Sequence, residues 1–324
     1  MYNILTIGDI KLDTFILIED ANVMCELKMP ACKLCIEYGK KIPVKDIDTQ
    51  IAGSAPNVAI GLAKMKKSTA VYAQMGKDIL HRLAVEFLKE NKVDTKFVKA
   101  TTGVDTPFAA VLNFKGESTQ LVSHDGIEYR LPKRLPATEW VHVSELGNGY
   151  EKLYRDLIAL SKKKRVKISF NPGVVQIAER KKALLDLLKE TTVLFLNKSE
   201  AEDLVQSKGK IEMHSLVAEL KKLGPNYVVI TDGRNGAYSY NGAQLDYAPM
   251  FPGGRVEATG AGDAFTTGFL GAIMHDRFHS DALRWASVNA ASVVGEIGPT
   301  KGLLTHTEIK KRLKARPSYK TKEL

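Results

Sequence analysis

The stretch EATGAGDAF, residues Glu257–Phe265, decides the predicted fold and the predicted site. Two glycines and an alanine lead to Asp263, and the apolar run AFTTGFLGAIM follows. A run that is apolar on most sides predicts a buried helix, which Gly268 and Gly271 would allow to pack closely. Glycines just before a helix turn backbone N–H groups toward a bound anion, which the helix dipole also attracts. The stretch therefore predicts an anion site beside Asp263, with a plain N-cap as the alternative interpretation of that aspartate.

Other phosphate-binding patterns are absent from the sequence. The dinucleotide fingerprint needs a third glycine where Phe265 stands. No G-x-x-x-x-G-K-[ST] segment occurs, which excludes a P-loop enzyme. The H-R-D and D-F-G motifs of protein kinases do not occur either.

The second half of the chain alternates strands and helices. From Trp140 onward, the strand-like runs WVHVSEL, VKISFNPG, VLFLN and YVVITDG are separated by helical patterns near 151–163, 178–189 and 214–223. This alternation implies a parallel sheet with helices over both faces. Earlier in the chain, Ser54 is expected as an N-cap with Pro56 in the first helical turn. The β-rich pieces at about 14–50 and 107–124 predict a small separate sheet.

The size and composition predict a sizeable core. The chain has 324 residues, of which 44% are hydrophobic, enough for two domains or one large α/β domain. No apolar stretch reaches about 18 residues and the start MYNILTIGDIKLD lacks a basic head, so we expect neither a membrane span nor a signal peptide. The cysteines Cys25, Cys32 and Cys35 form an incomplete zinc set; they fit strand packing and a reducing cytoplasm.

The positive charge is concentrated at the end of the chain. Residues 301–324 hold eight lysines and arginines against two acids, a net +6 of the total +10. A helix end in solvent explains this better than a nucleic-acid contact, because no nucleic-acid-binding motif accompanies it. Thr305 with Glu308 predicts a capping box at the start of the last helix.

Five segments together resemble the ribokinase family, the PfkB carbohydrate and nucleoside kinases. GDIKLD (8–13) resembles the family's opening substrate loop and AGSAPNVA (52–59) its N-terminal signature. NKSE (197–200) resembles its N-x-x-E motif, TDGRNG (231–236) its nucleotide loop and TGAGDAF (259–265) its C-terminal signature. They lie in family order along nearly the whole chain. The resemblance implies one kinase domain over residues 1–324, with a three-layer α/β/α fold around a mostly parallel sheet. It also implies a small β-sheet lid from the 14–50 and 107–124 segments.

The resemblance implies transfer of the γ-phosphoryl group of ATP to a hydroxyl group. Such a transfer passes through a loose transition state, so catalysis rests on positioning and on neutralising charge. By resemblance Asp263 is the base that takes the hydroxyl proton. The N–H groups of Gly260, Ala261 and Gly262 would then form the anion hole for the moving phosphoryl group.

The first two motifs imply the acceptor site. Asp13 matches the family's acceptor of sugar hydroxyls, with a surface aspartate at a strand end as the alternative. Gly53 and Asn57 match the residues that close on the substrate, with a helix cap as the alternative for Asn57. Glu145 matches a family glutamate at the end of its strand. Lys11 departs from ribokinase itself, and it would either meet an anionic acceptor or point to solvent.

The remaining motifs imply the nucleotide site. Thr231, Gly233 and Gly236 match the nucleotide loop, and Asn289 resembles an adenine-side residue. Asn197 and Glu200 resemble the pair that organises Mg2+ and phosphate through water, since Mg2+ keeps much of its hydration. A helix cap and a solvated acid are the alternatives for this pair.

A monovalent cation such as K+ is also implied by the resemblance. Many relatives bind one beside the anion hole, using an aspartate where this chain has Glu257. Thr259 is retained beside it, but the longer side chain of Glu257 departs from the pattern.

The predicted function is Mg-ATP-dependent phosphorylation of a hydroxymethyl group of a sugar or nucleoside. A sugar-acid or sugar-phosphate kinase is the alternative within the family. An inactive nucleotide- or sugar-binding protein and a nucleic-acid-binding protein acting through the basic tail are alternatives from other classes. By resemblance we also expect a cytoplasmic homodimer formed through the lid.

Overall fold

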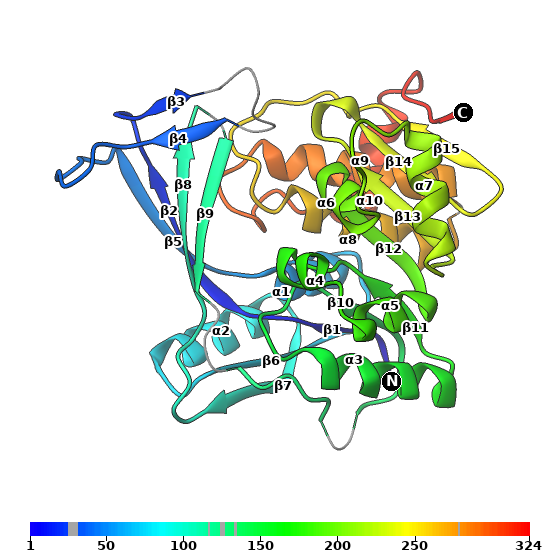
Figure 1. The fold of residues 1–324 in the computed structure, drawn as a ribbon, viewed down its shortest axis with the longest axis horizontal. Helices are drawn as coiled ribbons and strands as arrows, with labels where there is room; N and C mark the ends of the chain where they lie inside the picture. The colour runs from blue at the N-terminus through cyan, green and yellow to red at the C-terminus, as the bar shows by residue number, and fades with distance from the viewer. Residues whose placement is uncertain (25–31, 116, 124–126, 133–134, 278) are drawn as a thin grey trace.

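In the computed structural model the chain forms a large sheet and a smaller one that stands to its side (Figure 1). The structure describes residues 1–24, 32–115, 117–123, 127–132, 135–277 and 279–324. Cys25 lies outside these residues. Cys35 is half-buried, and no cluster of metal-binding side chains occurs in the described ranges. No helix of that same part is both long enough and apolar enough to cross a membrane.

The large sheet has ten strands. In spatial order they are β16 (Lys322–Glu323), β15 (Leu245–Ala248), β14 (Ala237–Tyr240), β13 (Tyr227–Thr231), β12 (Thr191–Asn197), β11 (Lys167–Phe170), β10 (Thr138–Val143), β1 (Tyr2–Ile7), β6 (Thr69–Gly76) and β7 (Asp94–Thr101). The strands from β7 to β13 run parallel, and those from β13 to β16 pair antiparallel. The sheet is therefore mostly parallel, as the sequence predicts.

Helices connect the strands and cover both faces of this sheet. They are α1 (Ser54–Lys64), α2 (Ile79–Glu90), α3 (Glu151–Lys164), α4 (Val174–Glu179), α5 (Lys182–Lys189), α6 (Lys198–Leu204), α7 (Met213–Lys222), α8 (Ala261–Ile273), α9 (His279–Val294) and α10 (His306–Lys314), with a short 3-10 helix at Gly233–Asn235.

Alternate residues of each strand face opposite helical layers. Val228 and Ile230 of β13 lie in one core with side chains of α3, α5, α6 and α7. Val229 lies in a second core with side chains of α1, α8, α9 and α10. Because strand side chains alternate between faces, a run of consecutive apolar residues fills both cores. This arrangement confirms the three-layer α/β/α fold.

The smaller sheet consists of four strands. Its order is β5 (Asp46–Ala52), β2 (Lys11–Leu17), β8 (Phe108–Phe114) and β9 (Glu117–Ser123). β2 follows β1 after three residues, so the chain passes directly from the large sheet into the small one. A two-stranded ribbon of β3 (Asn22–Met24) and β4 (Lys33–Cys35) lies beyond it (Figure 1). The predicted small sheet is confirmed, and its action as a lid stays a prediction.

Two local predictions are wrong in detail. Gly53 and not Ser54 is the N-cap of α1, and Ser54 is the first helical residue. The helix expected near 178–189 is two helices, α4 and α5, because Arg180 takes the left-handed conformation and ends α4. The capping box of Thr305 and Glu308 at the start of α10 is confirmed.

The buried helix of the opening stretch is confirmed as α8. It packs closely on two neighbours because glycines face them. A Cβ on Gly268 would lie 2.6 Å from Ala286 Cα of α9, and one on Gly271 would lie 2.3 Å from Met65 Sδ beside α1. A larger side chain at Gly268 would push α8 away from the α9 backbone, whereas one at Gly271 would require the flexible Met65 side chain to move.

Candidate active site

The polar residues of the motifs follow the carboxyl ends of the parallel strands. Asp9 follows β1, Glu145 follows β10, and Asn197 ends β12 beside Thr231 of β13. Crevices at this edge are where open α/β sheets bind ligands, because loops from several strands converge there. The small sheet starts at the same edge, since β2 follows β1 directly.

Asp263 and Asn57 are brought together from opposite ends of the sequence. The Asn57 amide donates a hydrogen bond of 2.7 Å to the Asp263 carboxylate. Gly260 is the N-cap of α8, so Asp263 lies in the first turn with its side chain directed at α1 and makes no cap. Asn57 is buried in the first turn of α1 and caps nothing. The capping alternatives for both residues are therefore wrong.

The backbone before each helix requires glycine. Gly53 has φ +124°, and a Cβ there would lie 2.3 Å from the Asp9 carbonyl oxygen. Gly260 has φ +78°, and its Cβ would meet Pro299 at 2.4 Å. L-residues rarely adopt either conformation, so both turns depend on glycine. These turns set the direction in which α1 and α8 present Asn57 and Asp263.

Lys11, Asp13 and Glu145 form a charged cluster beside this pair. Lys11 and Asp13 lie on β2 and are 5% and 3% exposed, so neither points to solvent. Lys11 Nζ makes an ion pair of 2.8 Å with Glu145 Oε1. Asp13 Oδ1 and Asn57 Oδ1 accept no hydrogen bond from any residue that the structure describes. Two buried oxygens without donors are typical of a site that a ligand completes.

The pKa values of the cluster reflect burial among like charges. Burial raises the pKa of Asp263 to about 6, and Glu145 adds to the rise, while Asn57 and Lys11 oppose it. Burial also raises the pKa of Asp13 to about 6, with Lys11 opposing and Glu145 and Asp263 adding. Burial lowers the pKa of Lys11, but Glu145, Asp13 and Asp263 together more than offset this, so the pKa of Lys11 lies above its usual value. Carboxylates with pKa values nearer neutrality are typical of acid–base sites.

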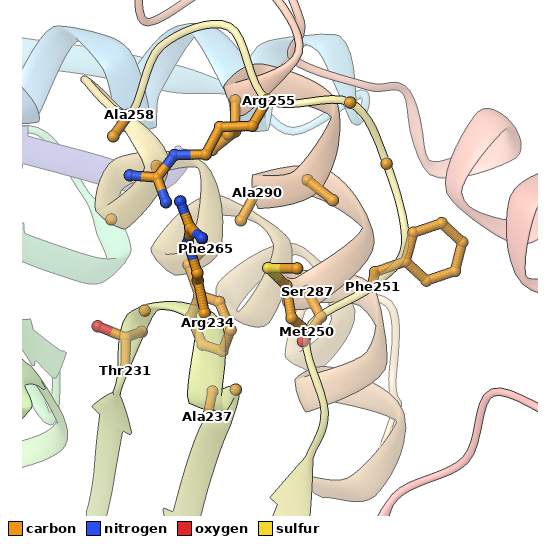
Figure 2. A pocket seen from close by; sticks show the side chains of 18 residues that line it. Thr231, Arg234, Ala237, Met250, Phe251, Arg255, Ala258, Phe265, Ser287 and Ala290 are labelled. Carbon is orange, nitrogen blue, oxygen red and sulfur yellow. The ribbon is translucent and has the colours of Figure 1, made fainter. Parts of the chain in front are cut away.

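A cavity of about 440 Å³ lies on the other side of the α8 start. Thr231, Gly233 and Gly236 line it, as do Ala261 and Gly262 (Figure 2). The predicted nucleotide loop and two residues of the predicted anion hole therefore line the same cavity. The N–H of Ala261 bonds to the Ala258 carbonyl at 3.2 Å, so this amide already has an acceptor.

Asn289 does not reach the wall of this cavity. Its side chain is fully buried, donates to the Ala264 carbonyl at 2.7 Å and accepts from the Leu304 N–H at 2.9 Å. It thereby ties α8 to the segment before α10. Ser287 and Ala290, two residues before it and one after, line the cavity instead.

Asn197 and Glu200 make a reciprocal capping box at the start of α6, the alternative considered for them. Asn197 Oδ1 accepts from the Glu200 N–H and Glu200 Oε2 accepts from the Asn197 N–H, each at 2.9 Å. The Glu200 carboxylate is nevertheless not a fully solvated acid. Burial raises its pKa, and the nearby carboxylates Glu145 and Asp203 add to the rise.

Glu257 is a buried carboxylate between the signature loop and the small sheet. One oxygen accepts from the Thr259 N–H at 3.1 Å and lies 3.4 Å from the Ser118 hydroxyl of β9. The other oxygen accepts from the Gly298 N–H at 3.0 Å. No cationic side chain of the described residues lies within ion-pair distance of it.

Sequence reasoning missed the buried contacts that shape the loop after β10. The Tyr129 hydroxyl lies 2.9 Å from both Asp9 carboxylate oxygens, to which it donates, and it accepts from the Gly147 N–H at 2.8 Å. The Gln176 amide donates to the Leu146 carbonyl at 2.7 Å. No local sequence pattern predicts these contacts, because the partners are far apart in sequence.

Comparisons with known proteins show the family of this chain. The model of the pfkB family carbohydrate kinases matches residues 18–306. A fructokinase of Klebsiella pneumoniae is 28% identical over 68% of this chain and 76% of its own, and a 5-dehydro-2-deoxygluconokinase of Lacticaseibacillus casei is 23% identical over 83% and 88%.

Two solved structures share the fold. Arabidopsis thaliana ribokinase complexed with ribose and ATP has a TM-score of 0.78 and 21% identity, covering 97% of this chain and 99% of its own. A Burkholderia thailandensis nucleoside kinase in complex with inosine has a TM-score of 0.78 and 18% identity, covering 98% and 99%. With the family model spanning most of its length, the chain is a phosphotransferase that belongs to the pfkB family of carbohydrate kinases.

Proposed function

We propose that this kinase transfers the γ-phosphoryl group of ATP to a hydroxymethyl group of a neutral sugar or nucleoside. The observation that carries the proposal is the place of Asp263. Its carboxylate bonds to Asn57 in the charged cluster, while Ala261 and Gly262 of the same helical turn line the cavity. One turn of α8 therefore separates a site for the acceptor from a site for the nucleotide.

The residues support direct transfer between these two sites. Asp263 would take the proton of the acceptor hydroxyl. At the same time the hydroxyl oxygen attacks the γ-phosphorus, and the bond between that phosphorus and the ADP oxygen breaks. With a pKa of about 6, the carboxylate is mostly ionised at neutral pH and still basic enough to accept a proton. Asp13 Oδ1 and Asn57 Oδ1 would accept hydrogen bonds from acceptor hydroxyls, which completes their bonding.

The charge of the cluster favours a neutral acceptor over an anionic one. Asp13, Glu145 and Asp263 are acids, and the single cation among them, Lys11, is already paired with Glu145. A sugar acid or sugar phosphate would meet this excess of negative charge after losing its hydration, which is unfavourable. The sugar-acid and sugar-phosphate alternative is therefore the weaker proposal.

The donor site suits a hydrated Mg2+. Glu200 presents a half-buried carboxylate whose neighbours are acidic, and Asn197 adds an amide oxygen beside it. When bound, Mg2+ would neutralise charge on the nucleotide phosphates. We expect chelation of the metal with EDTA to abolish turnover, and excess Mg2+ to restore it.

A monovalent cation fits beside Glu257. Its carboxylate is 4% exposed and is satisfied only by neutral donors, so its charge is uncompensated by the described residues. We propose that K+ binds there with Thr259 nearby. Replacing K+ by tetramethylammonium in the assay is expected to lower kcat, and an equal kcat in both salts would exclude the site.

The small sheet is proposed as a lid over the acceptor and as a dimer interface. One face carries Asp13 toward the site, and the opposite face exposes apolar side chains such as Ile47 and Leu121. We also propose a cytoplasmic location, where ATP is supplied.

An acceptor screen tests the proposal directly. The full-length protein with Mg-ATP would be offered pentoses, hexoses, nucleosides, sugar acids and sugar phosphates, and ADP release would be measured. We expect turnover with a neutral sugar or nucleoside and none above background with anionic acceptors. Preference for an anionic acceptor would reverse the charge argument.

The variant Asp263→Asn is the control for this screen. It keeps the size of the side chain and a hydrogen bond with Asn57, but it cannot take the proton. We expect kcat to fall by about 10²–10⁴-fold, the usual contribution of a general base. Turnover near the wild-type rate would remove Asp263 from its proposed role.

A further inference from the structure

The nucleotide cavity has two chemically different ends. Ala237, Met250, Phe251 and Ala290 give one part an apolar wall. The other part holds Arg234 and Arg255 beside Ala258 and Phe265 (Figure 2), and none of the described residues that line the cavity is an aspartate or glutamate. Such a division suits a ligand with an apolar ring at one end and anionic groups at the other.

The two arginines come from different segments and meet at one side. Arg234 lies in the 3-10 helix between β13 and β14, and Arg255 lies in the segment before α8. In Figure 2 both guanidinium groups point toward the Ala258 side of the cavity, away from Phe251. Ala261 and Gly262, at the start of α8, line the same cavity, so the positive end of the helix dipole adds to their field.

The arginines differ in their existing partners. Arg234 is exposed and has no acidic partner among the residues that the structure describes. Arg255 Nη2 pairs with Glu117 Oε1 at 2.7 Å, and Glu117 lies on β9 of the small sheet, the proposed lid. The Glu117 side chain is 71% exposed, so the pair is weak and open to competition.

We propose that Arg234 and Arg255 bind the phosphates of the donor that lie between its nucleoside and the transferred phosphoryl group. This inference rests on the proposed function. A guanidinium group binds two phosphate oxygens with parallel hydrogen bonds, which a single exposed carboxylate does not match. Arg255 therefore exchanges Glu117 for phosphate when the donor enters, and this exchange releases the lid strand from the signature loop.

The test compares ligands that differ only in their phosphates. Binding of adenosine, AMP and ADP would be measured by calorimetry for the wild type, Arg234→Met and Arg255→Met. We expect each variant to weaken the binding of ADP about tenfold or more and that of AMP less, because charge-assisted hydrogen bonds to the phosphates are lost. The affinity for adenosine should stay within about twofold of the wild-type value. Arg82→Met on α2, an exposed arginine outside the cavity, is the matched control and should change none of the three.

Conservative variants separate a direct contact from a structural effect. Arg234→Lys and Arg255→Lys keep the charge, so they should retain part of the ADP affinity that the methionine variants lose. The inference would be overturned if the methionine variants bound adenosine, AMP and ADP with equally reduced affinity, or if they bound ADP as tightly as the wild type. A wild type that binds none of these ligands would overturn the proposed function as well, which makes the two failures distinguishable.

The exchange at Arg255 has its own test. Glu117→Gln removes the competing carboxylate, so ADP should bind up to about fivefold more tightly while adenosine is unchanged. An ADP affinity that is equal to or weaker than that of the wild type would exclude the exchange.

Discussion

At the scale of single residues, burial of two carboxylates dominates the chemistry of the site. Asp13 and Asp263 share a cluster with Glu145, and Lys11 is the one cation of the described residues in this cluster that opposes their charge. Each pKa rises from 3.8 to about 6, because the charged form loses water and faces like charge. The same feature that favours proton transfer must therefore lower the stability of the fold.

The pH dependence of turnover follows from this. We expect kcat/KM to fall about tenfold per pH unit below pH 6, since only ionised Asp263 can take a proton. Initial rates between pH 4.5 and 8.5 at constant ionic strength would measure the profile. An acid limb near pH 4 would mean that burial does not raise the pKa of the proposed base, Asp263.

The free energy of unfolding should change with pH in the opposite direction to turnover: it should fall as the pH rises. A folded-state pKa above the unfolded one gives stability that is complete below about pH 4 and is lost as pH rises through about 6. Asp263→Asn does not titrate, so at pH 8 it should be more stable than the wild type by about 1–3 kcal/mol, and equally stable near pH 4. Urea unfolding at both pH values measures this, with Asp105→Asn as an exposed control that should show no such difference.

At the scale of elements, two turns that contain glycine fix the directions of two helices. α1 begins after Gly53 and α8 begins after Gly260. Both glycines have positive φ, and a Cβ on either one would lie too close to the backbone of Asp9 or to Pro299. Asn57 and Asp263 meet only because these turns fix the start of each helix. The glycines are therefore structural parts of the proposed active site, whether or not they touch a substrate.

Gly53→Ala tests this element. The new Cβ would lie 2.3 Å from the Asp9 carbonyl in a strained conformation, so we expect a loss of about 2–4 kcal/mol in the free energy of unfolding and a large fall in kcat. Gly39→Ala is the matched control: its φ is also positive, but nothing lies within 4 Å. The Gly39→Ala variant should lose only about 1 kcal/mol in the free energy of unfolding and should keep its kcat. Equal effects of the two changes in urea unfolding and kcat would show that the close approach at Gly53 is unimportant.

At the scale of the whole molecule, the small sheet has two faces with different surroundings. The register places Asp13, Phe15 and Ala109 on the face toward the site, where all three are buried. Ile47 and Leu121 lie on the opposite face and are 58% and 59% exposed. An exposed apolar sheet face of this kind is typical of an interface between subunits.

We expect Leu121→Lys to shift the proposed homodimer to a monomer, because a charge would be buried in the interface. Sedimentation velocity over a range of concentrations measures the mass. Gln120→Lys adds the same charge on the opposite face of the same strand and should leave the dimer intact. A wild type that is monomeric at all concentrations would refute the interface.

The sequence by itself determined the order of strands and helices, the parallel sheet and the position of Asp263 at the start of α8. These depend on patterns within a few residues, such as the apolar strand runs and the glycines at 260 and 262, and short-range patterns survive without tertiary contacts. Tertiary structure alone decided the partners: Asn57 with Asp263, Lys11 with Glu145, Glu117 with Arg255, and Asn289 with Ala264. Each of these pairs joins residues from different elements, and their bonds depend on how the helices and sheets pack, which no local pattern encodes.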